Sequence, residues 1–469
     1  MRRILGWILP IVPGRLVYML QQQEYDTNKF IKWMIRYPNL WHIQRRGTFV
    51  RTKRALALKV FAAAVYWAWV GLVIVVSLDD PRYLLALSIA GLITAYMLAM
   101  LNLCLQVAVV SPGQRREIAQ AKARINEMKD IPRIAVLGSF GKTSMKELLN
   151  TVLSEGKTVA VTPGNKNVLI SHARWVRSLP NDCDVLVFEY GEAEPGDIQK
   201  LASFSQPTHA VVTGLAPAHL DYYPSLEAVA DDLADILDFV EPQDVWFNDH
   251  TQLLSTRFTD AHSYSSESSA KTSVSGVKVD FSGTTFTVKQ GKKHTTYQTK
   301  LLGTHHIGPL LAVIDIAHRL GLNDDQIKVG VAATRPYEHR MQPRSLHGAW
   351  IIDDAYNGNI EGMKAGLSLL AALPAQRRIY VTPGLVDQGS ENEQVHVELG
   401  KLIAQSAPDV VVLMQNQNTP YIERGLREEG FDGQVTLEDD PLTYYSGLEH
   451  HLAAGDVVML QNDLPDSYA

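Results

Sequence analysis

The 469-residue sequence predicts an α/β protein in which two transmembrane helices precede a P-loop domain with a parallel sheet and a C-terminal Rossmann-like domain. Two uncharged runs near the N-terminus, 60–78 and 83–110, are each long enough to span a bilayer. Beyond residue 130, short apolar runs alternate with helical stretches, which is the pattern of a parallel sheet covered by helices. A glycine loop with lysine and threonine, at 138–143, follows the first of these apolar runs.

Composition narrows the classes of partner. The net charge of -6 is mild and argues against nucleic acid as a partner. The two cysteines, Cys104 and Cys183, cannot build a disulfide framework. A chain of this length can hold two or three domains.

Residues 1–54 form a basic segment that we expect to lie close to a membrane. The segment holds eleven Lys and Arg against two acidic residues, and six Trp and Tyr are interleaved with them. Basic residues with interfacial aromatics are typical of segments on an anionic membrane face. A nucleic-acid patch is the alternative, and the apolar runs that follow argue against it.

Residues 55–110 are predicted to form a transmembrane hairpin. Its two apolar runs are joined by a short charged loop, 79–82. Lys and Arg flank the outer ends of the runs, at 45–54 and at 115–116, which places both ends in the cytoplasm. A polar linker helix is expected at 111–130. The sequence therefore predicts a protein of the cytoplasmic membrane with its soluble domains in the cytoplasm.

The soluble part is predicted to hold a central domain, 131–334, and a C-terminal domain, 335–469. In the central domain, apolar runs predict buried strands at 134–137, 159–162, 185–188 and 210–213. Helices are expected at 143–154, 195–204, 225–240 and 305–320, and the alternating segment 272–300 predicts a β-meander. In the C-terminal domain, strands are expected at 351–352, 379–381, 410–414 and 457–460, and helices at 362–373 and 395–406.

The stretch Arg133–Asn150 has the layout of a phosphate-binding loop. An apolar strand leads into the loop, and a helix begins directly after it. In such a loop the backbone N–H groups and the helix N-terminus face a phosphate, the lysine adds a positive charge, and the hydroxyl ligates Mg²⁺. The spacing is shorter than in the common P-loop, and an ordinary βα turn is the alternative. The expected nucleotide-binding residues are Gly138, Ser139, Gly141, Lys142, Thr143 and Ser144.

Two residues at strand ends extend this site. Glu189 ends one predicted strand, and His219 follows the next one. The carboxyl ends of neighbouring parallel strands share one rim, so both residues can join Thr143 in holding metal ions. A histidine alone at such a place is more often structural, and the shared rim with Lys142 favours the metal role.

A third group of residues lies in the C-terminal domain. Arg340 comes near its start, and Asp354, Tyr356 and Asn357 follow an apolar strand. We expect these side chains at a strand end. Asp, Asn and Gly also favour hydrogen-bonded turns for local reasons, which is the alternative.

Six segments occur in an order that resembles the Mur ligase family: GSFGKTS, FEYGEAEPGDI, VVTGLAPAHLDYYPSLEAVA, EHRMQP, DDAYNGNIEGMKA and GDVV. The resemblance covers about residues 131–469. It implies ATP-dependent amide formation, in which a carboxylate attacks the γ-phosphate to give an acyl phosphate and an amine then displaces phosphate. It also implies ATP and Mg²⁺ as cofactors.

The same resemblance gives each site residue an expected role. Lys142 would hold the β- and γ-phosphates, and Thr143, Glu189 and His219 would hold the metals. Arg340 would reach the nucleotide from the last domain. Lys142, Glu189, His219 and Arg340 are therefore the predicted catalytic residues. The adenosine and the interdomain face would be lined by Asp354, Tyr356 and Asn357.

The sequence departs from the family pattern at three places. The N-terminal domain that binds the UDP sugar is missing, and the basic segment and the hairpin stand in its place. Leu233 stands where the family often carries a carbamylated lysine. We hypothesise that Asp232 or Asp235 supplies the missing negative oxygen, and a solvated acidic helix face is the alternative. Residues 382–385 and 462–466 differ from the common amino-acid-binding pattern, which leaves the incoming amine open.

The sequence as a whole predicts a membrane-anchored ligase that adds an amino acid or dipeptide to a peptide or cell-wall precursor, such as a peptidoglycan precursor. The expected partners are these substrates and the membrane. One alternative is a membrane-associated poly-amino-acid synthase of the capsule type. Another is a non-catalytic scaffold that binds nucleotide, which Leu233 favours and the set of Lys142, Thr143, Glu189 and His219 disfavours.

Overall fold

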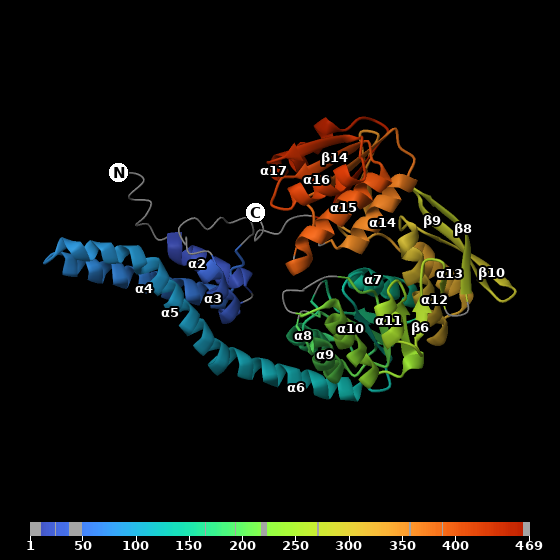
Figure 1. Cartoon of the computed structure of the whole chain (residues 1–469). Helices are drawn as coiled ribbons and strands as arrows, with labels where there is room; N and C mark the ends of the chain where they lie inside the picture. The colour runs from blue at the N-terminus through green and yellow to red at the C-terminus, as the bar shows by residue number, and fades with distance from the viewer. Residues whose placement is uncertain are drawn as a thin grey trace. The chain divides into compact units, whose positions relative to one another are not determined.

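The computed structural model describes residues 11–23, 25–36, 49–164, 166–192, 194–216, 223–269, 272–355, 358–386 and 388–462. Three predicted site residues, His219, Tyr356 and Asn357, lie outside these ranges. The chain divides into two compact units, Met1–Glu117 and Ile118–Ala469, and Figure 1 shows the ribbon of each.

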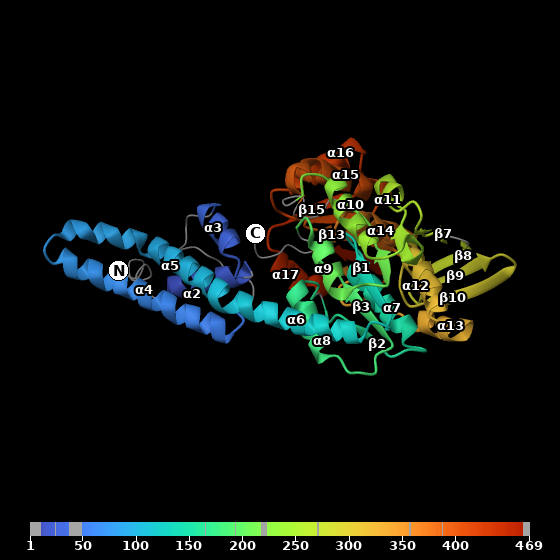
Figure 2. The ribbon, with the colours of Figure 1, turned by 90° about the horizontal axis from the view of Figure 1, so that it is seen from below.

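The first unit is built around a hairpin of two apolar helices. Thr52 begins the first of them, because its hydroxyl accepts a hydrogen bond from the N–H of Ala55 at 3.0 Å. Figure 2 shows α4 and α5 running side by side. The elements of the unit are α2 (Ile11–Gln22), α3 (Thr27–Arg36), α4 (Lys53–Ser77), η1 (Pro81–Ile89), α5 (Ala90–Leu105), a π-helical turn (Gln106–Val110) and the start of α6 (Ser111–Glu127).

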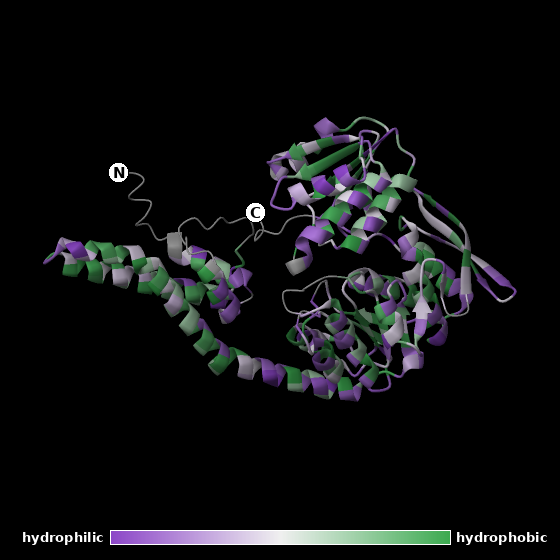
Figure 3. Cartoon of the chain, in the orientation of Figure 1, coloured by the Kyte–Doolittle hydropathy of each residue, from purple (hydrophilic) through white to green (hydrophobic). Residues whose placement is uncertain are grey.

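The hairpin carries apolar side chains on its outside as well as on its inside. Two helical stretches, Lys53–Ser77 and Pro81–Glu127, are long and apolar enough to cross a membrane. Large side chains such as Leu72, Val75 and Leu85 are exposed, and Figure 3 shows apolar residues along both arms of the hairpin, with hydrophilic residues at its tip. A soluble protein rarely leaves so continuous an apolar surface in water. The two predicted apolar helices are confirmed, and their position in a membrane stays a prediction.

The described part of the basic segment packs against the hairpin. Leu20 of α2 and Phe30 of α3 lie in one apolar cluster with Leu58 of α4 and Leu98 of α5. The described part of the segment that precedes the hairpin therefore forms α2 and α3, and apolar side chains of both helices face α4 and α5.

A buried asparagine connects these helices. Arg54 of α4 donates to Oδ1 of Asn102 at 2.8 Å. The side-chain amide of Asn102 donates to the carbonyl oxygen of Tyr25 at 2.8 Å and to the hydroxyl of Thr27 at 2.9 Å. Because a buried amide must find partners, this network fixes the start of α3 against α5.

The central domain is a ten-stranded sheet with the strand order β10-β9-β8-β7-β6-β5-β4-β1-β3-β2. Strands β1 to β6 pair in parallel, and β6 to β10 continue the sheet in antiparallel pairs. The predicted strands and the meander are confirmed. The strands are β1 (Arg133–Leu137), β2 (Val159–Val161), β3 (Val185–Glu189), β4 (His209–Val212), β5 (Val245–Asn248), β6 (His262–Tyr264), β7 (Ser268–Ser269), β8 (Thr272–Asp280), β9 (Gly283–Gln290) and β10 (Lys293–Thr299).

Helices cover both faces of this sheet. Successive residues of a strand point to opposite faces, so β1 places Ala135 and Leu137 in one apolar cluster and Ile134 and Val136 in another. The first cluster is covered by α8 (Leu169–Ser178), α9 (Asp197–Ser205), α10 (Leu226–Ala234) and α11 (Gln252–Arg257). The second cluster is covered by α7 (Lys142–Leu153), α12 (Ile307–Arg319) and α13 (Asp324–Ala333).

The C-terminal domain is a six-stranded sheet with the order β11-β12-β16-β13-β14-β15. Its strands pair in parallel, except for the β11–β12 hairpin. The strands predicted at 351–352, 379–381, 410–414 and 457–460 are confirmed. The elements are β11 (Gln342–Leu346), β12 (Ala349–Asp354), α14 (Ile360–Ala372), β13 (Arg377–Thr382), α15 (Asn392–Ser406), β14 (Val410–Met414), α16 (Thr419–Glu428), β15 (Gln434–Glu438), α17 (Pro441–Ser446) and β16 (Asp456–Gln461).

The second half of α6 packs into the central domain. Ala121 and Ile125 are fully buried in the apolar cluster that α8 covers. Between them, the guanidinium of Arg124 donates to the carbonyl oxygens of Val176 at 3.1 Å and Leu179 at 2.5 Å. Both apolar burial and hydrogen bonds therefore hold this part of α6 to α8.

We expect a soluble fragment that begins at residue 131 to be less stable than one that begins at residue 118. The shorter fragment lacks Ile125 and Met128, and full burial of such a side chain contributes about 1.5–3 kcal/mol. Urea unfolding of the two fragments measures the difference. The variant Arg124→Ala of the longer fragment separates the hydrogen bonds from the apolar contacts. Equal unfolding free energies for the two fragments would contradict the expectation.

Candidate functional site

The turn after β1 requires glycine at position 138. Gly138 has a φ of +129°, and a Cβ there would lie 2.6 Å from the hydroxyl of Thr213 and 2.8 Å from the carbonyl oxygen of Gly214. The N–H of Ser139 donates to that same carbonyl at 2.8 Å. Gly141, with a φ of +76°, then begins α7 as its N-cap residue. The N-terminus of α7 therefore lies at the carboxyl edge of the sheet, where its free N–H groups can bind an anion.

Lys142 is held by two oxygens of the protein. Its ammonium donates to the carbonyl oxygen of Gly138 at 2.5 Å and to Oε1 of Glu192 at 2.7 Å. The Lys142 side chain is 14% exposed and that of Glu192 is 3% exposed. Burial raises the pKa of the Glu192 carboxyl, Asp232 adds to this effect, and the charge of Lys142 opposes it.

Thr143 and Glu189, two of the predicted metal ligands, lie in direct contact. The hydroxyl of Thr143 donates to Oε1 of Glu189 at 2.9 Å. The fully buried ammonium of Lys146 lies 3.0 Å from Oε2 of the same carboxylate and donates to the carbonyl oxygen of Gly164 at 2.5 Å. One lysine thus neutralises the carboxylate from the side opposite to Thr143.

His172 of α8 fixes the strand end from which Glu189 projects. Its Nε2 lies 2.9 Å from the carbonyl oxygen of Glu189, so Nε2 carries the proton and donates it. The ring is fully buried between Phe188 and Tyr190, and this burial lowers the pKa of His172 to about 4. The histidine is therefore neutral near pH 7 and acts as a hydrogen-bond donor to the backbone.

The oxygens of Thr143 and Glu189 fit a Mg²⁺ ion. Mg²⁺ binds one or two protein oxygens together with phosphate oxygens and water. Oε2 of Glu189 is buried and already contacts the ammonium of Lys146 at 3.0 Å, so Oε1 is the oxygen on the side of Thr143. Among the described residues, no group of three or more His, Cys, Asp and Glu side chains could hold a metal. Phosphate oxygens would have to complete such a site, and the third predicted ligand, His219, lies outside the described residues.

The position of the expected carbamylated lysine is part of the apolar core. Leu233 is fully buried in the cluster that covers one face of the sheet. Its neighbour Asp232 is 7% exposed and accepts hydrogen bonds from the N–H of Gly196 at 2.5 Å and the hydroxyl of Tyr223 at 2.8 Å. The interpretation of a solvated acidic helix face is therefore wrong for Asp232. Asp235 lies partly exposed after the end of α10.

Arg340 lies near the first turns of α7. It lines a small hollow together with Ser144 and Glu147 of α7 and with His306, at the start of α12. The ring of His306 is buried, and its Nε2 has no hydrogen-bond partner. The structure thus brings Arg340 and Ser144, both predicted from the sequence, to one place.

Asp354 lies at the end of β12, as predicted. Its carboxylate accepts hydrogen bonds from the N–H of Met341 at 3.2 Å and from the side-chain amide of Gln461 at 2.9 Å. Burial raises the pKa of Asp354 to about 6, while these hydrogen bonds and the charge of Arg340 oppose the shift. The neighbouring predicted residues, Tyr356 and Asn357, lie outside the described residues.

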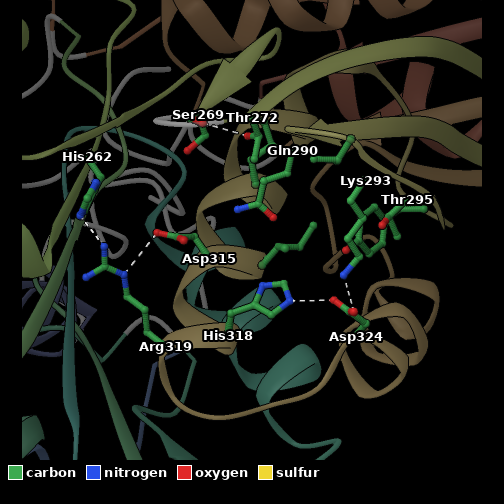
Figure 4. Close-up of a pocket in the computed structure, with 14 residues that line it drawn as sticks. His262, Ser269, Thr272, Gln290, Lys293, Thr295, Asp315, His318, Arg319 and Asp324 are labelled. Carbon is green, nitrogen blue, oxygen red and sulfur yellow. Dashed lines mark hydrogen bonds and ion pairs between the residues drawn. The ribbon is translucent and has the colours of Figure 1, made fainter.

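A larger cavity lies away from the phosphate-binding loop. It has a volume of about 210 Å³ and is lined by the meander and by α12 and α13 (Figure 4). Its charged groups are already paired, because Asp324 contacts both Lys293 and His318, and Arg319 lies 3.5 Å from Asp315. Arg319 also donates to the carbonyl oxygen of Gln243, before the amino end of β5. This cavity is therefore at the opposite end of the strands from the loop, and it offers no unpaired charge to a ligand.

Sequence reasoning missed three side chains of the site: Lys146, Glu192 and His306. Lys146 follows Lys142 by one helical turn, a spacing that places both on one face of α7. Glu192 follows Glu189 by three residues, directly after Gly191. These spacings were the available signals, whereas nothing in the local sequence marks His306 as buried.

The fold and the site together define a class of protein. The chain has a short P-loop at the carboxyl edge of a parallel sheet, with a hydroxyl and a carboxylate beside the loop. A second α/β domain follows. This is the architecture of a P-loop nucleotide-binding enzyme. Residues 136–317 match the Mur ligase middle domain, and residues 339–461 match the Mur ligase, glutamate ligase domain. The chain belongs to the Mur ligase family. Members of this family are ATP-dependent ligases that use Mg²⁺, so the predicted enzyme class and cofactors are confirmed at the level of the family.

Similar curated proteins are named UDP-N-acetylmuramoyl-tripeptide–D-alanyl-D-alanine ligase. The one from Escherichia coli (strain K12) is 28% identical over 295 residues, which cover 61% of this chain and 65% of that protein. The one from Synechocystis is 28% identical over 337 residues, 71% of each chain. The one from Bacillus subtilis is 24% identical over 347 residues, 73% of this chain and 75% of that protein. The chain therefore spans just under two thirds of the first of these relatives.

Solved structures share the fold. MurF from Acinetobacter baumannii superposes with a TM-score of 0.66 at 19% identity, over 74% of this chain and 77% of that one. MurF ligase from Thermotoga maritima in complex with ADP gives a TM-score of 0.66 at 20% identity, over 75% and 80%. A pseudomurein peptide ligase type C from Methanothermus fervidus gives 0.57 at 16% identity, over 72% and 77%.

We expect Lys146→Met to destabilise the folded protein strongly, because the lysine is fully buried behind the site. The change leaves the carboxylate of Glu189 buried without its cation, which costs roughly 3–5 kcal/mol. Urea unfolding of the variant measures the loss, and Lys166→Met, at an exposed position, is the control. The double variant Lys146→Met with Glu189→Gln should recover part of the loss, because it removes the unpaired charge. A loss no larger than that of the control would contradict this account.

The raised pKa of Asp354 predicts a pH dependence of stability. An unfolded Asp has a pKa near 3.9, so the folded protein holds a proton on Asp354 more tightly than the unfolded chain does. The resulting stabilisation is present at low pH and is lost as the pH rises through about 6. Asp354→Asn should therefore gain stability relative to the wild type as the pH rises from roughly 4 to about 6, and the difference should level off above that range. Thermal unfolding across this range tests the prediction, with the exposed Asp432→Asn as control; parallel pH profiles for wild type and variant would refute it.

Proposed function

We propose that this protein is an ATP-dependent ligase that forms an amide bond through an acyl phosphate. The observation that carries the proposal is the placement of Lys142 in the glycine loop and of Thr143 in contact with Glu189, both at the carboxyl edge of the sheet. This network occurs in a chain that matches both the middle and the C-terminal Mur ligase domains. Such a reaction needs a positive charge beside the transferred phosphoryl group and a site that holds a metal ion, both at one place.

In the proposed reaction, a carboxylate oxygen of the acceptor attacks the γ-phosphorus of ATP, and ADP leaves. The nitrogen of the amine then attacks the acyl carbon, and inorganic phosphate leaves with the oxygen of the broken C–O bond. Lys142 and the N–H groups at the start of α7 would bind the β- and γ-phosphates. Thr143 and Glu189 would hold Mg²⁺, which when bound offsets the charge on the transferred group.

Arg340 would add a positive charge from the other domain. It lines the same hollow as Ser144 in the first turn of α7, close to where the nucleotide would lie. An arginine here can contact phosphate oxygens only while the two domains are close together, so it would couple catalysis to the arrangement of the domains.

The names of the relatives suggest which substrates to propose for this chain. Those proteins are ligases of UDP-N-acetylmuramoyl-tripeptide and D-alanyl-D-alanine. For this chain we propose the same kind of reaction, in which an amino acid or dipeptide is joined to a peptide or cell-wall precursor.

The apolar hairpin is the basis for a membrane location. Its exposed leucine and valine side chains would be covered by lipid, and each end of the hairpin is flanked by basic residues in the sequence. We propose that α4 and α5 span the cytoplasmic membrane and that the second unit lies in the cytoplasm. Anchoring would raise the effective concentration of a lipid-linked acceptor near the site.

One observation favours a different function. Leu233 is fully buried and apolar, so this position cannot contribute a ligand to a second metal. A protein that binds nucleotide without turning it over, and acts as a membrane scaffold, would be consistent with this loss.

Phosphate release separates these possibilities. The full chain in detergent, with ATP and Mg²⁺, is tested against a panel of amines and of soluble and lipid-linked wall precursors. We expect release that requires both an amine and an acceptor, and at least a roughly hundredfold loss in Lys142→Ala, because the lysine stabilises the transferred phosphoryl group. Faster turnover of lipid-linked than of soluble precursor is expected from the anchor.

Three outcomes would count against parts of the proposal. Nucleotide binding without turnover on any combination would favour the scaffold. Turnover of amino acids onto a growing peptide, without any muramyl precursor, would favour a capsule-type synthase. Equal use of soluble and lipid-linked precursors would remove the functional argument for anchoring.

A further inference from the structure

The ion pair between Lys142 and Glu192 occupies the lysine that the proposed function assigns to phosphate. The two side chains meet at 2.7 Å, and both are shielded from water, with exposed fractions of 14% and 3%. The second contact of the ammonium is the carbonyl oxygen of Gly138, within the loop itself. Two of the three N–H donors of Lys142 are therefore used by contacts within the protein.

Glu192 has few other partners in this place. Its Oε2 atom is buried without a hydrogen-bond partner. The other ionisable groups that act on its charge are Asp232, which repels it, and Tyr223, whose hydroxyl is turned to Asp232. In the part of the chain that the structure describes, Lys142 is thus the cation that pairs with this carboxylate.

A phosphate on the loop and Glu192 require the same ammonium. If Lys142 turns to a phosphate oxygen, Glu192 loses its cation while it stays buried close to new negative charge. Both changes are unfavourable, because an unpaired charge in a poorly solvated place is costly. The ion pair therefore opposes the binding of nucleotide, and the loss of the cation is the part of this effect that depends on Lys142.

We propose that Glu192 is a positioning residue that holds Lys142 in the nucleotide-free protein and is displaced from it by the phosphates of the nucleotide. This inference rests on the proposed role of Lys142 in nucleotide binding. Glu192 would keep the lysine extended along the loop, and it would weaken the affinity for nucleotide so that ADP is released after each reaction. The same contact would exclude weaker anions from the empty loop, because they would have to displace a buried carboxylate.

The affinity of variants for nucleotide tests the proposal. Binding of Mg²⁺-ADP and Mg²⁺-ATP to the full chain in detergent is measured by calorimetry for the wild type, Glu192→Gln and Glu194→Gln. Glu194 is exposed and close in sequence, so it is a matched control for the loss of one charge. We expect Glu192→Gln to bind nucleotide on the order of tenfold more tightly, and the control to change by less than about twofold.

A double-mutant cycle with Lys142→Met distinguishes competition for the lysine from a general structural effect. If Glu192 acts mainly through Lys142, then Glu192→Gln should gain clearly less affinity in the Lys142→Met background than in the wild type. Glu192→Asp keeps the charge on a shorter side chain, so it should bind nucleotide with an affinity between those of the wild type and Glu192→Gln. It also serves as a second variant if Glu192→Gln does not fold. Thermal unfolding of each variant verifies the fold independently of binding.

Several results would overturn the inference. Weaker binding by Glu192→Gln would mean that the carboxylate contacts the nucleotide or its metal. Unchanged binding would mean that the ion pair does not compete, and an equal gain in the Lys142→Met background would mean that it acts elsewhere. If the wild type binds no nucleotide, then the proposed function itself fails, which is a different outcome from an unaffected Glu192→Gln.

Discussion

The candidate site depends on the pairing of two lysines with two buried carboxylates. Lys142 and Lys146 lie one turn apart on α7, and Glu189 and Glu192 lie at the end of β3 and just beyond it. Each charge would be costly to bury alone, so the helix and the strand are constrained to one relative position. The glycines of the loop make this position accessible, because Gly138 lets the backbone pass within contact distance of β4. Phosphate chemistry is thus built on charges that the fold must satisfy even without a ligand.

Much of the fold could be predicted because its signals are local. The runs that became β1, β3 and β4 are apolar throughout, and the loop after β1 has both glycines and the lysine in sequence order. Strands such as β5 and β6 were not predicted, because β5 ends in Asn248 and β6 begins with His262 and Ser263, so neither is an apolar run as clear as those of β1 and β3. The edge strands β11 and β15 were also not predicted, because they are partly exposed and carry polar residues. Their place in the sheet depends on neighbours that are distant in the sequence.

The site was predictable to the extent that its residues follow strand ends. Thr143 and Glu189 meet as the shared rim of two neighbouring strands requires, and Arg340 lies near the first turns of α7. The partners that neutralise them were not predictable, since Lys146 and Glu192 are ordinary surface residue types that become buried only after packing. Asp232 shows the same limit, because its neighbour Asp231 is exposed while it is buried against Tyr223. Charge in the sequence does not reveal which side of a helix will be covered.

Leu233 bears on how the protein responds to dissolved carbon dioxide. A carbamylated lysine forms when a lysine amine takes up dissolved carbon dioxide, and it reverts when the gas is removed. An apolar side chain that is fully buried cannot take part in such an exchange. Where other members of the family rely on this modification, their catalytic centre is linked to the supply of bicarbonate. Position 233 of this chain offers no amine that could take up carbon dioxide.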